Sequence, residues 1–532
     1  MIRFDDVGVT YAGRDAAVLR DVSFEIGAGE FVLVTGRTGS GKSTLLRAIN
    51  GLVPHATGGT LSGAVSVLDR STADHPPREF AHLVGSVGQD PLAAFVTDTV
   101  EEELAYGMEQ LGTDPQVMRR RVEELLDLLG IVELRGRALR ALSGGQQQRV
   151  AIGAALGPHP PVLVLDEPTS ALDPTAAEEV LATLARLVHD LDVTIVLAEH
   201  RLERVLPFVD RVLLVEGDGS VTDGAPAAKV QRLEHAPPIV ELGRLAGWDP
   251  IPLTVRDARA AHRTTPVPVD DGDAGAATAP NAAAPVSEVV LDADGIEVRF
   301  GSRVAVRGVD LTFHRGDVLA VMGRNGAGKS SLLWALRDPA TMTAGSVTTD
   351  ARIALVPQTA SDLLVADRVE RECADADARA GAPAGSCAAL LARLAPYVRP
   401  DAHPRDLSAG GQLALALAMQ LVGGADVVLL DEPTRGLDYA GKAQLADIVA
   451  DLAHAGSAIA IATHDVEFAA QVASRAIVLA DGEVVSDGAA AEVLAASPAF
   501  APQVTKVLGG AWRTVAQVRE ALEARSPVEV GS

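Results

Sequence analysis

The sequence predicts an α/β fold that occurs twice within one chain of 532 residues. The first observation is that short, almost continuously apolar runs, such as residues 162–165 and 427–430, alternate with helical stretches. This pattern is typical of a mainly parallel sheet covered by helices on both faces. The second is that an Asp-Glu pair follows each of these runs, at Asp166 and Asp431, 23 residues after a serine in both halves. Such self-similarity indicates a duplicated domain.

The order of the motifs suggests four segments. We expect one α/β domain over residues 1–250, a flexible Ala/Pro/Asp-rich linker over 251–287, a second α/β domain over 288–508 and a C-terminal tail over 509–532. Residues 100–158 and 362–424 have helical patterns and predict an inserted helical subdomain in each domain, beside an antiparallel β part.

Composition excludes several classes of protein. The apolar content of 48% and the charged content of 22% are those of folded domains. A net charge of −25 argues against a broad nucleic-acid-binding surface, which needs many basic side chains. The two cysteines, Cys373 and Cys387, match no metal or disulfide spacing and favour a reducing compartment. No apolar run reaches about 18 residues, so we expect no transmembrane segment. Trp334 and Phe313 are expected in the core.

Each half contains the pattern G-x-x-x-x-G-K-[ST] after an apolar β-branched run and before a Leu-rich helix. Glycines allow the backbone to curl around a polyphosphate, and the helix N-terminus directs N–H groups at it. The lysine can reach the β- and γ-phosphates, and the next serine can hold Mg²⁺. The phosphate-binding residues predicted in this way are Gly36, Arg37, Thr38, Gly39, Ser40, Gly41, Lys42, Ser43 and Thr44, and Gly323, Arg324, Asn325, Gly326, Ala327, Gly328, Lys329, Ser330 and Ser331.

The Asp-Glu pairs supply the remaining chemistry. Asp166 and Asp431 stand at the carboxyl ends of strands beside the phosphate loops, where they can orient Mg²⁺ together with Ser43 and Ser330. The adjacent Glu167 and Glu432 are placed to accept a proton from the attacking water. ATP and Mg²⁺ are therefore the expected substrate and cofactor.

These motifs resemble those of ABC ATPase domains. Residues 142–146 read L-S-G-G-Q, and residues 166–173 and 431–438 read D-E-P-T-x-x-L-D, which are similar to the family's signature, Walker B and D-loop sequences. The resemblance covers nearly the whole chain outside the linker and tail. It implies further site residues. Gln89 and Gln358 match the Q-loop glutamines that ligate the metal, His200 and His464 match the catalytic switch histidines, Tyr11 and Phe300 match the aromatic that stacks on adenine, and Ser143, Gly144, Gly145, Gln146, Ser408, Gly410 and Gly411 match the signature residues that contact nucleotide.

The resemblance also implies how the halves work together. Two such domains pair head to tail, and each ATP lies between one domain's phosphate loop and the other's signature. Hydrolysis removes this bridge, and the change can do work on a partner. The second signature departs from the pattern because Ala409 stands at the position of Gly144. An alanine limits positive φ and close backbone approach. We therefore expect the site of Lys42 to be weaker than the site of Lys329.

Several kinds of ABC protein fit. Residues 97–109 and 198–212 resemble the ATPase subunits of energy-coupling-factor (ECF) importers of vitamins or metal ions. In these importers a transmembrane subunit docks near the Q-loops and a separate small membrane protein captures substrate. The chain would then lie peripherally on the cytoplasmic face of the membrane. A tandem ATPase of a sugar or peptide importer remains open, as does a soluble tandem protein acting on ribosomes. A DNA-repair ABC protein would need zinc-binding cysteine clusters, which the sequence lacks.

Overall fold

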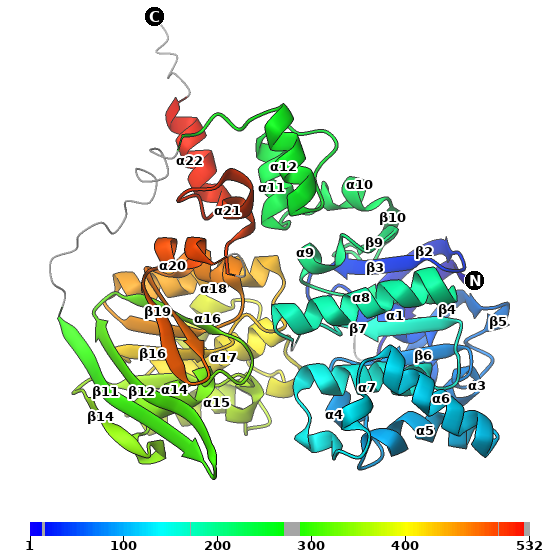
Figure 1. Cartoon of the computed structure of the whole chain (residues 1–532), viewed down its shortest axis with the longest axis horizontal. Helices are drawn as coiled ribbons and strands as arrows, with labels where there is room; N and C mark the ends of the chain where they lie inside the picture. The colour runs from blue at the N-terminus through cyan, green and yellow to red at the C-terminus, as the bar shows by residue number, and fades with distance from the viewer. Residues whose placement is uncertain (13–15, 171, 271–287, 498–499, 526–532) are drawn as a thin grey trace, which may run out of the picture. The chain divides into compact units, whose positions relative to one another are not determined.

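A computed structural model describes residues 1–12, 16–170, 172–270, 288–497 and 500–525. The chain forms two compact units, Met1–Pro237 and Pro238–Ser532 (Figure 1). Each unit contains a six-stranded sheet, a smaller antiparallel sheet and a helical insert. The tandem α/β class, with its two predicted helical inserts, is therefore confirmed.

The larger sheet of the first unit has the strand order β10-β9-β3-β8-β7-β6, parallel except for β10. Every residue of β8 is buried, which explains its continuous rather than alternating apolar pattern. The smaller sheet has the order β2-β1-β4-β5 and is antiparallel.

The strands of this unit are β1 (Ile2–Thr10), β2 (Leu19–Ile26), β3 (Phe31–Gly36), β4 (Thr60–Val67), β5 (Arg70–Ser71), β6 (Val84–Val87), β7 (Val162–Asp166), β8 (Thr194–Ala198), β9 (Arg211–Val215) and β10 (Val221–Gly224). Its helices are α1 (Lys42–Ile49), α2 (Leu52–His55), α3 (Pro77–Phe80), α4 (Pro91–Ala94), α5 (Val100–Gln110), α6 (Pro115–Leu128), α7 (Gly144–Leu156), α8 (Pro174–Leu191), α9 (Leu202–Val205) and α10 (Pro226–Val230). Helices α5, α6 and α7 form the helical insert, where α5 packs on both others.

The second unit repeats this plan. Its larger sheet has the order β15-β16-β17-β13-β18-β19, with only β19 antiparallel, and its smaller sheet has the order β12-β11-β14. Between the phosphate loop and β15 the second unit has a shorter chain than the first, and its small sheet has one strand fewer.

The strands of the second unit are β11 (Val289–Phe300), β12 (Arg303–His314), β13 (Val318–Gly323), β14 (Ala344–Thr348), β15 (Ile353–Val356), β16 (Val427–Asp431), β17 (Ala458–Ala462), β18 (Arg475–Ala480) and β19 (Glu483–Ala489). Its helices are α11 (Pro238–Leu245), α12 (Val255–Thr264), α14 (Lys329–Arg337), α15 (Val369–Ala380), α16 (Ser386–Leu394), α17 (Ala409–Leu421), α18 (Tyr439–His454), α19 (Val466–Val472), α20 (Ala490–Ala496), α21 (Gln503–Leu508) and α22 (Val515–Arg525).

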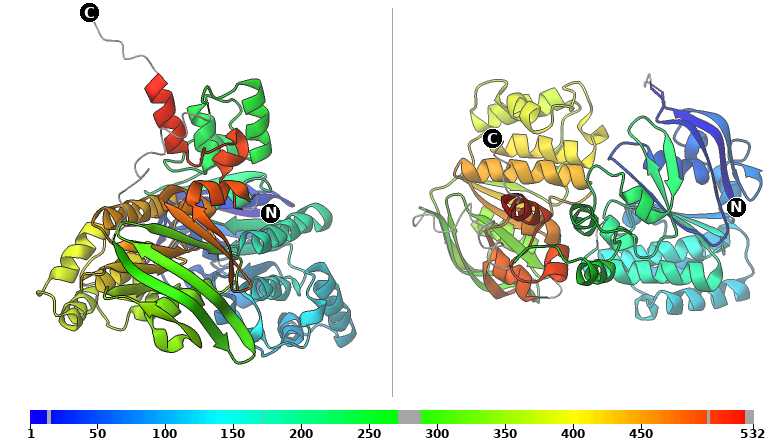
Figure 2. Two further views of the ribbon diagram at one scale, coloured as in Figure 1. Left: turned by 60° about the vertical axis from the view of Figure 1, so that its left-hand side comes forward. Right: turned by 90° about the horizontal axis from the view of Figure 1, so that it is seen from above.

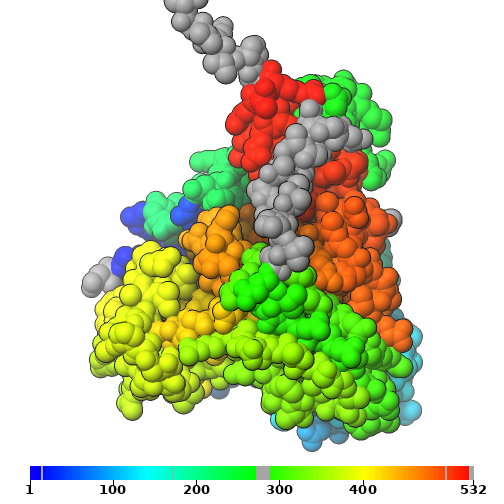
Figure 3. All heavy atoms as spheres, turned by 90° about the vertical axis from the view of Figure 1, so that its left-hand side faces the viewer, coloured from blue at the N-terminus to red at the C-terminus, as the bar shows by residue number. Residues whose placement is uncertain are grey.

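The structure differs from the expected linker and tail. Helices α11 and α12 pack with α21 and α22 at one end of the second unit (Figures 1 and 2). The Arg259 guanidinium donates to the Lys506 carbonyl at 2.6 Å, and Trp512 is almost fully buried. In the space-filling view the C-terminal helices (red) adjoin the green segment that contains α11 and α12 (Figure 3). Residues 238–270 thus belong to the second unit, while 271–287 lie outside the described residues.

The physical reason is that residues 238–270 contain several apolar side chains that become buried. The overall composition of the region does not reveal them. Ile239, Leu242 and Trp248 are buried, although Pro, Ala and Asp dominate the residues that follow. Some of the contacts of this segment lie far along the chain: the Ile239 N–H donates to the Gln503 side chain at 3.1 Å, 264 residues away. Local sequence patterns do not register contacts over such a separation.

Candidate functional site

The first phosphate loop closes around its own lysine. Lys42 begins α1, and its Nζ donates to the carbonyls of Gly36 and Arg37, both at 3.0 Å. A Cβ at Gly36 would lie 2.3 Å from the Val215 carbonyl, so only glycine fits where the loop leaves β3. The loop therefore holds a positive charge at the start of a helix.

The second loop has the same geometry. The Nζ of Lys329 donates to the carbonyls of Gly323 at 2.9 Å and Arg324 at 3.3 Å. A Cβ at Gly328, whose φ is 106°, would lie 2.2 Å from the Ala305 carbonyl. Neither α1 nor α14 has a side-chain cap, which leaves first-turn N–H groups available to an anion. Both loops fit a polyphosphate.

A buried acid lies beside each loop, at the end of β7 and β16. Burial raises the pKa of Asp166, although a hydrogen bond from Ser43 acts in the opposite direction. Burial likewise raises the pKa of Asp431, and Ser330 opposes this shift. Among the described residues, Asp431 Oδ1 is buried without a hydrogen-bond partner. A desolvated carboxylate with a spare oxygen beside a serine hydroxyl has the chemistry of a Mg²⁺ ligand set, so these residues fit the metal.

The glutamate after each acid is paired with the predicted switch histidine. Nε2 of His200 lies 2.8 Å from Glu167 Oε1, and Nδ1 of His464 lies 2.7 Å from Glu432 Oε2. Burial alone would raise the pKa of both carboxyls, but the histidine and the loop lysine outweigh it and lower the pKa of each. Nζ of Lys329 is 3.5 Å from Glu432 Oε1. Both glutamates are therefore held as carboxylates, the form that can accept a proton.

Both glutamates also have left-handed backbones, with φ of 52° at Glu167 and 49° at Glu432. This conformation is uncommon outside glycine, and bulky residues avoid it. Its occurrence at the same motif position in both units shows that the turn after the acid strand is determined by the surrounding structure, since the local sequence does not favour it.

The structure places the other predicted residues less uniformly. The Tyr11 hydroxyl lies 3.2 Å from Thr44 Oγ1, at the first phosphate loop. Phe300 ends β11 and is 64% exposed. Gln89 reaches Glu167, whose pKa it helps to lower. Gln358 is exposed, and no such contact with Glu432 is recorded among the described residues.

Each signature begins a helix within its own unit. Ser143 caps α7 and forms a capping box with Gln146. Ser408 caps α17 by accepting from the Gly411 N–H at 3.2 Å, and the box is absent because Gly411 has no side chain. Gly144 lies inside α7 and has no positive φ. The part of the expectation that attributed a positive φ to this glycine is therefore wrong; only the added methyl group of Ala409 distinguishes the two signatures there.

One residue that sequence reasoning missed links the D-loop to the switch. The buried carboxylate of Glu199 accepts from the Thr169 hydroxyl and, at 3.0 Å, from the His200 N–H. In the second unit Thr463 precedes the histidine instead, and the buried Thr434 hydroxyl has no hydrogen-bond partner among the described residues. The signal was present in the sequence as an acid directly between an apolar strand and a predicted catalytic histidine.

A phosphate loop, a buried Asp-Glu pair and a histidine on that glutamate, all in one α/β unit, define a P-loop ATPase, and this chain contains two. The ABC transporter family matches residues 19–170 and 306–435. The chain belongs to the ABC transporter family and is an ATP-binding protein with two ABC ATPase domains. Domains of this family bind and hydrolyse ATP and normally use Mg²⁺.

Relatives span the whole chain. A protein of Streptomyces avermitilis that carries the name of an ABC transporter ATP-binding protein is 55% identical over 98% of this chain and 100% of its own length. One from Methanosarcina mazei with the same name is 31% identical over 93% and 90%. No helix in the described part of the chain has the length and apolar character needed to cross a membrane.

Solved structures share the fold. An RNase-L inhibitor is similar with a TM-score of 0.60 at 20% identity, covering 92% of each chain. A complex of archaeal ribosomal stalk protein aP1 and the ribosome recycling factor aABCE1 gives a TM-score of 0.59 at 21% identity, covering 92% of this chain and 91% of that one. At this identity the similarity concerns the fold of two tandem ABC domains.

Proposed function

We propose that this protein is the ATP-hydrolysing subunit of a membrane importer of the ECF type, with vitamins or metal ions as the substrate class. It acts peripherally at the cytoplasmic face of the membrane, on a transmembrane subunit that works with a separate substrate-capture protein. The observation that carries the proposal is the pairing of two complete ATPase sites with an ECF-like Q-loop region, residues 97–109.

The contacts around the Q-loop region support a docking role. Glu103, buried at the start of α5, accepts from the N–H groups of Val96 and Thr97 and from the Thr97 hydroxyl. Glu372 of α15 accepts from the N–H groups of Val365 and Ala366 in the same way. The two units therefore make the same type of contact at the start of this helix. Because these hydrogen bonds connect the Q-loop to the helical insert, a change at the nucleotide can be transmitted to a partner bound beside the Q-loop.

The proposed hydrolysis follows from the site geometry. Lys42 and Lys329 exchange their loop carbonyls for phosphate oxygens of ATP and neutralise charge on them. Glu167 and Glu432 accept a proton from the attacking water, while His200 and His464 orient these carboxylates. Asp166 with Ser43, and Asp431 with Ser330, would hold Mg²⁺, which would neutralise charge on the phosphates when bound. Signature residues of the opposite half complete each site in a head-to-tail sandwich.

The covalent connection between the halves favours this pairing. Two ATPase domains in one chain meet at a high effective concentration, so the sandwich can form without a second copy. The two sites are unequal in this proposal, because the first loop receives the signature with Ala409.

The test is to co-express the full chain with the membrane proteins encoded next to it. We expect the chain to co-purify with a multi-helix scaffold subunit in detergent and ATP hydrolysis to rise when the complex is reconstituted with substrate-capture protein. Sedimentation of the Glu167→Gln/Glu432→Gln protein with 70S ribosomes in the presence of ATP, without membrane association, would overturn the importer proposal in favour of a ribosomal role.

A further inference from the structure

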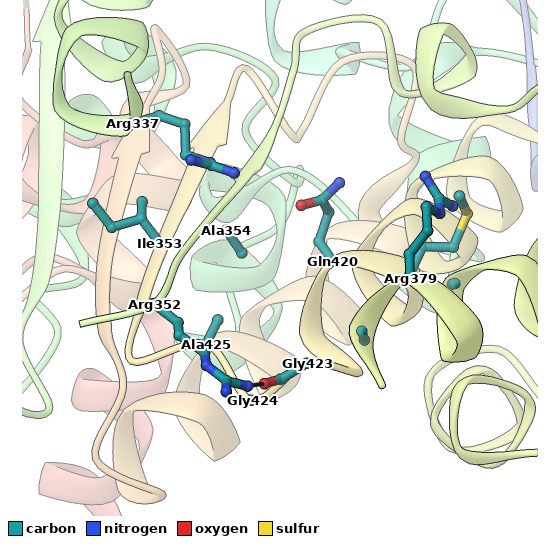
Figure 4. Close-up of a pocket in the computed structure, with 12 residues that line it drawn as sticks. Arg337, Arg352, Ile353, Ala354, Arg379, Gln420, Gly423, Gly424 and Ala425 are labelled. Atoms are coloured by element: carbon teal, nitrogen blue, oxygen red, sulfur yellow. Dashed lines mark hydrogen bonds between the residues drawn. The ribbon is translucent and has the colours of Figure 1, made fainter. Parts of the chain in front are cut away.

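The second unit contains a cavity lined by three arginines, at positions where the first unit has other residues. It has a volume of about 420 Å³, and Arg337, Arg352 and Arg379 line it together with Gln420 (Figure 4). These arginines come from the end of α14, the start of β15 and the end of α15. In a chain with a net charge of −25, three guanidinium groups around one cavity form a local reversal of charge.

The recorded partners of these arginine side chains are main-chain carbonyls, and the Asp426 carboxylate accepts from the main-chain N–H of Arg352 at 3.1 Å. The Arg352 side chain donates to the Gly423 carbonyl and that of Arg379 to the Asp375 carbonyl, which are both main-chain acceptors. None of the three appears in an ion pair among the described residues. Guanidinium groups present donors in a planar fork that matches a carboxylate, so the cavity is suited to an anionic group from outside the chain.

The cavity also has an apolar component. Ile353, Ala354 and Met419 contribute to its lining, as do Gly423 and Gly424. Trp334, expected in the core, is 44% exposed; it stands three residues before Arg337, which places both on one face of α14. Tryptophan and arginine are enriched at protein-binding surfaces, and a cavity of this size exceeds the needs of one small anion.

The first unit serves as an internal comparison. Asn50 stands eight residues after the loop lysine, as Arg337 does. The Leu83 carbonyl accepts from the N–H of the first residue of β7. The Arg352 carbonyl accepts in the same way from the first residue of β16, so Leu83 is the equivalent of Arg352. Gln110 stands seven residues after Glu103, as Arg379 does after Glu372. Arg47 takes the place of Trp334. All three cavity arginines are thus confined to the second unit.

The cavity is connected to the nucleotide site by covalent structure. Helix α14 begins at the loop lysine Lys329 and ends at Arg337, and β15 leads directly to Gln358. We propose that this basic cavity binds a carboxylate-bearing segment of the membrane partner, and that the first unit binds a segment without this requirement. The inference rests on the proposed function, and it assigns the two units different partner segments.

The test places a photo-crosslinking residue, p-benzoylphenylalanine, at Gln420 in the full chain, expressed in cells that naturally produce it. Ala155, the equivalent position on α7, serves as the first-unit control. We expect the Gln420 probe to attach to a membrane protein within a few residues of an Asp or Glu. Peptide sequencing of the crosslinked product identifies the segment.

Two sets of substitutions separate charge recognition from general docking. Arg337→Gln/Arg352→Gln/Arg379→Gln should reduce the Gln420 crosslink roughly tenfold and leave the Ala155 crosslink unchanged. Arg371→Gln/Arg393→Gln/Arg519→Gln removes the same charge from exposed positions outside the cavity and should leave both crosslinks intact. Circular dichroism and thermal unfolding verify that each variant folds.

A crosslinked membrane segment without a carboxylate, or a yield that the first triple substitution does not change, would overturn this inference while the importer proposal stands. A product with phospholipid alone would also overturn it and assign the cavity to a lipid headgroup. Attachment of both probes to ribosomal protein would contradict the proposed function itself.

Discussion

Nε2 of His200 lies 2.8 Å from Oε1 of Glu167, whereas the second unit makes the equivalent contact through Nδ1 of His464 at 2.7 Å. In each unit the histidine contacts the equivalent glutamate, but it does so through a different ring nitrogen. Against the opposing effect of burial, the loop lysine lowers the pKa of the glutamate in both units: Lys42 acts on Glu167, and Nζ of Lys329 lies 3.5 Å from Oε1 of Glu432. The two ATPase sites are therefore related by sequence repetition without being geometrically identical.

The first prediction concerns this inequality. Glu432→Gln should lower the steady-state ATPase rate more than Glu167→Gln, because in the proposed head-to-tail pairing the site of Lys329 receives the signature with Gly144 rather than Ala409. Removal of a general base costs about 10²–10⁴-fold at the affected site. Ala409→Gly should raise the rate that remains in the Glu432→Gln protein. A larger loss with Glu167→Gln would show that the inequality has the opposite direction.

The second prediction concerns the buried acid Asp431. Its pKa is raised by burial above the ordinary value of 3.8, so its ionised form is less favourable in the folded chain than in the unfolded chain. This cost is absent well below that value and fully present above the folded pKa. Without nucleotide at pH 7.5, Asp431→Asn should therefore raise the Tm by roughly 1–3 °C.

The matching measurement adds ATP and Mg²⁺. The unsubstituted chain should gain thermal stability from them through preferential binding to the folded state, and Asp431→Asn should lose most of this gain. A Tm that falls on substitution, or a nucleotide effect that survives it, would contradict the assignment of Asp431 as a metal ligand. Scanning calorimetry can assign the affected transition to one unit.

A third prediction concerns Glu199, which we assign as a positioning residue. Glu199→Thr installs the residue of the second unit and should lower kcat roughly tenfold with little change in KM for ATP. Its carboxylate joins Thr169 in the D-loop to the switch at His200. A double-mutant cycle with Thr169→Val should be non-additive, because both changes remove one contact. Additive losses would mean that Glu199 acts elsewhere.

The fourth prediction concerns the helices at the end of the second unit. Trp512 is 1% exposed, and its carbonyl accepts from the Thr505 hydroxyl. Trp512→Ala should destabilise the second unit by about 3–5 kcal/mol, the usual cost of removing a buried large aromatic side chain. Urea unfolding should show one transition shifted and the other unchanged. Unchanged unfolding would mean that α11, α12, α21 and α22 contribute no stability to the unit.

How much of this could be read from the sequence depends on the range of the interactions. The strands around Asp166 and Asp431 and the loops around Lys42 and Lys329 follow from local periodicity and from residue types that few backbone conformations allow. The packing of residues 238–270 against 503–525 could not be read, because buried residues such as Ile239 and Trp248 are scattered among Ala, Pro and Asp. Trp334 was predicted to lie in the core but is exposed. A single aromatic residue in a helical segment does not show which face of the helix is buried.

The sequence by itself determined that this protein has two α/β ATPase domains, because motif order and spacing repeat and each motif requires particular side chains at fixed local distances. Only the tertiary structure decided how these side chains meet. It brought Glu199 to Thr169, gave His200 and His464 different contacting nitrogens, and gathered Arg337, Arg352 and Arg379 around one cavity. Each of these relationships joins residues from separate elements, and packing in three dimensions, rather than spacing along the chain, sets their distances.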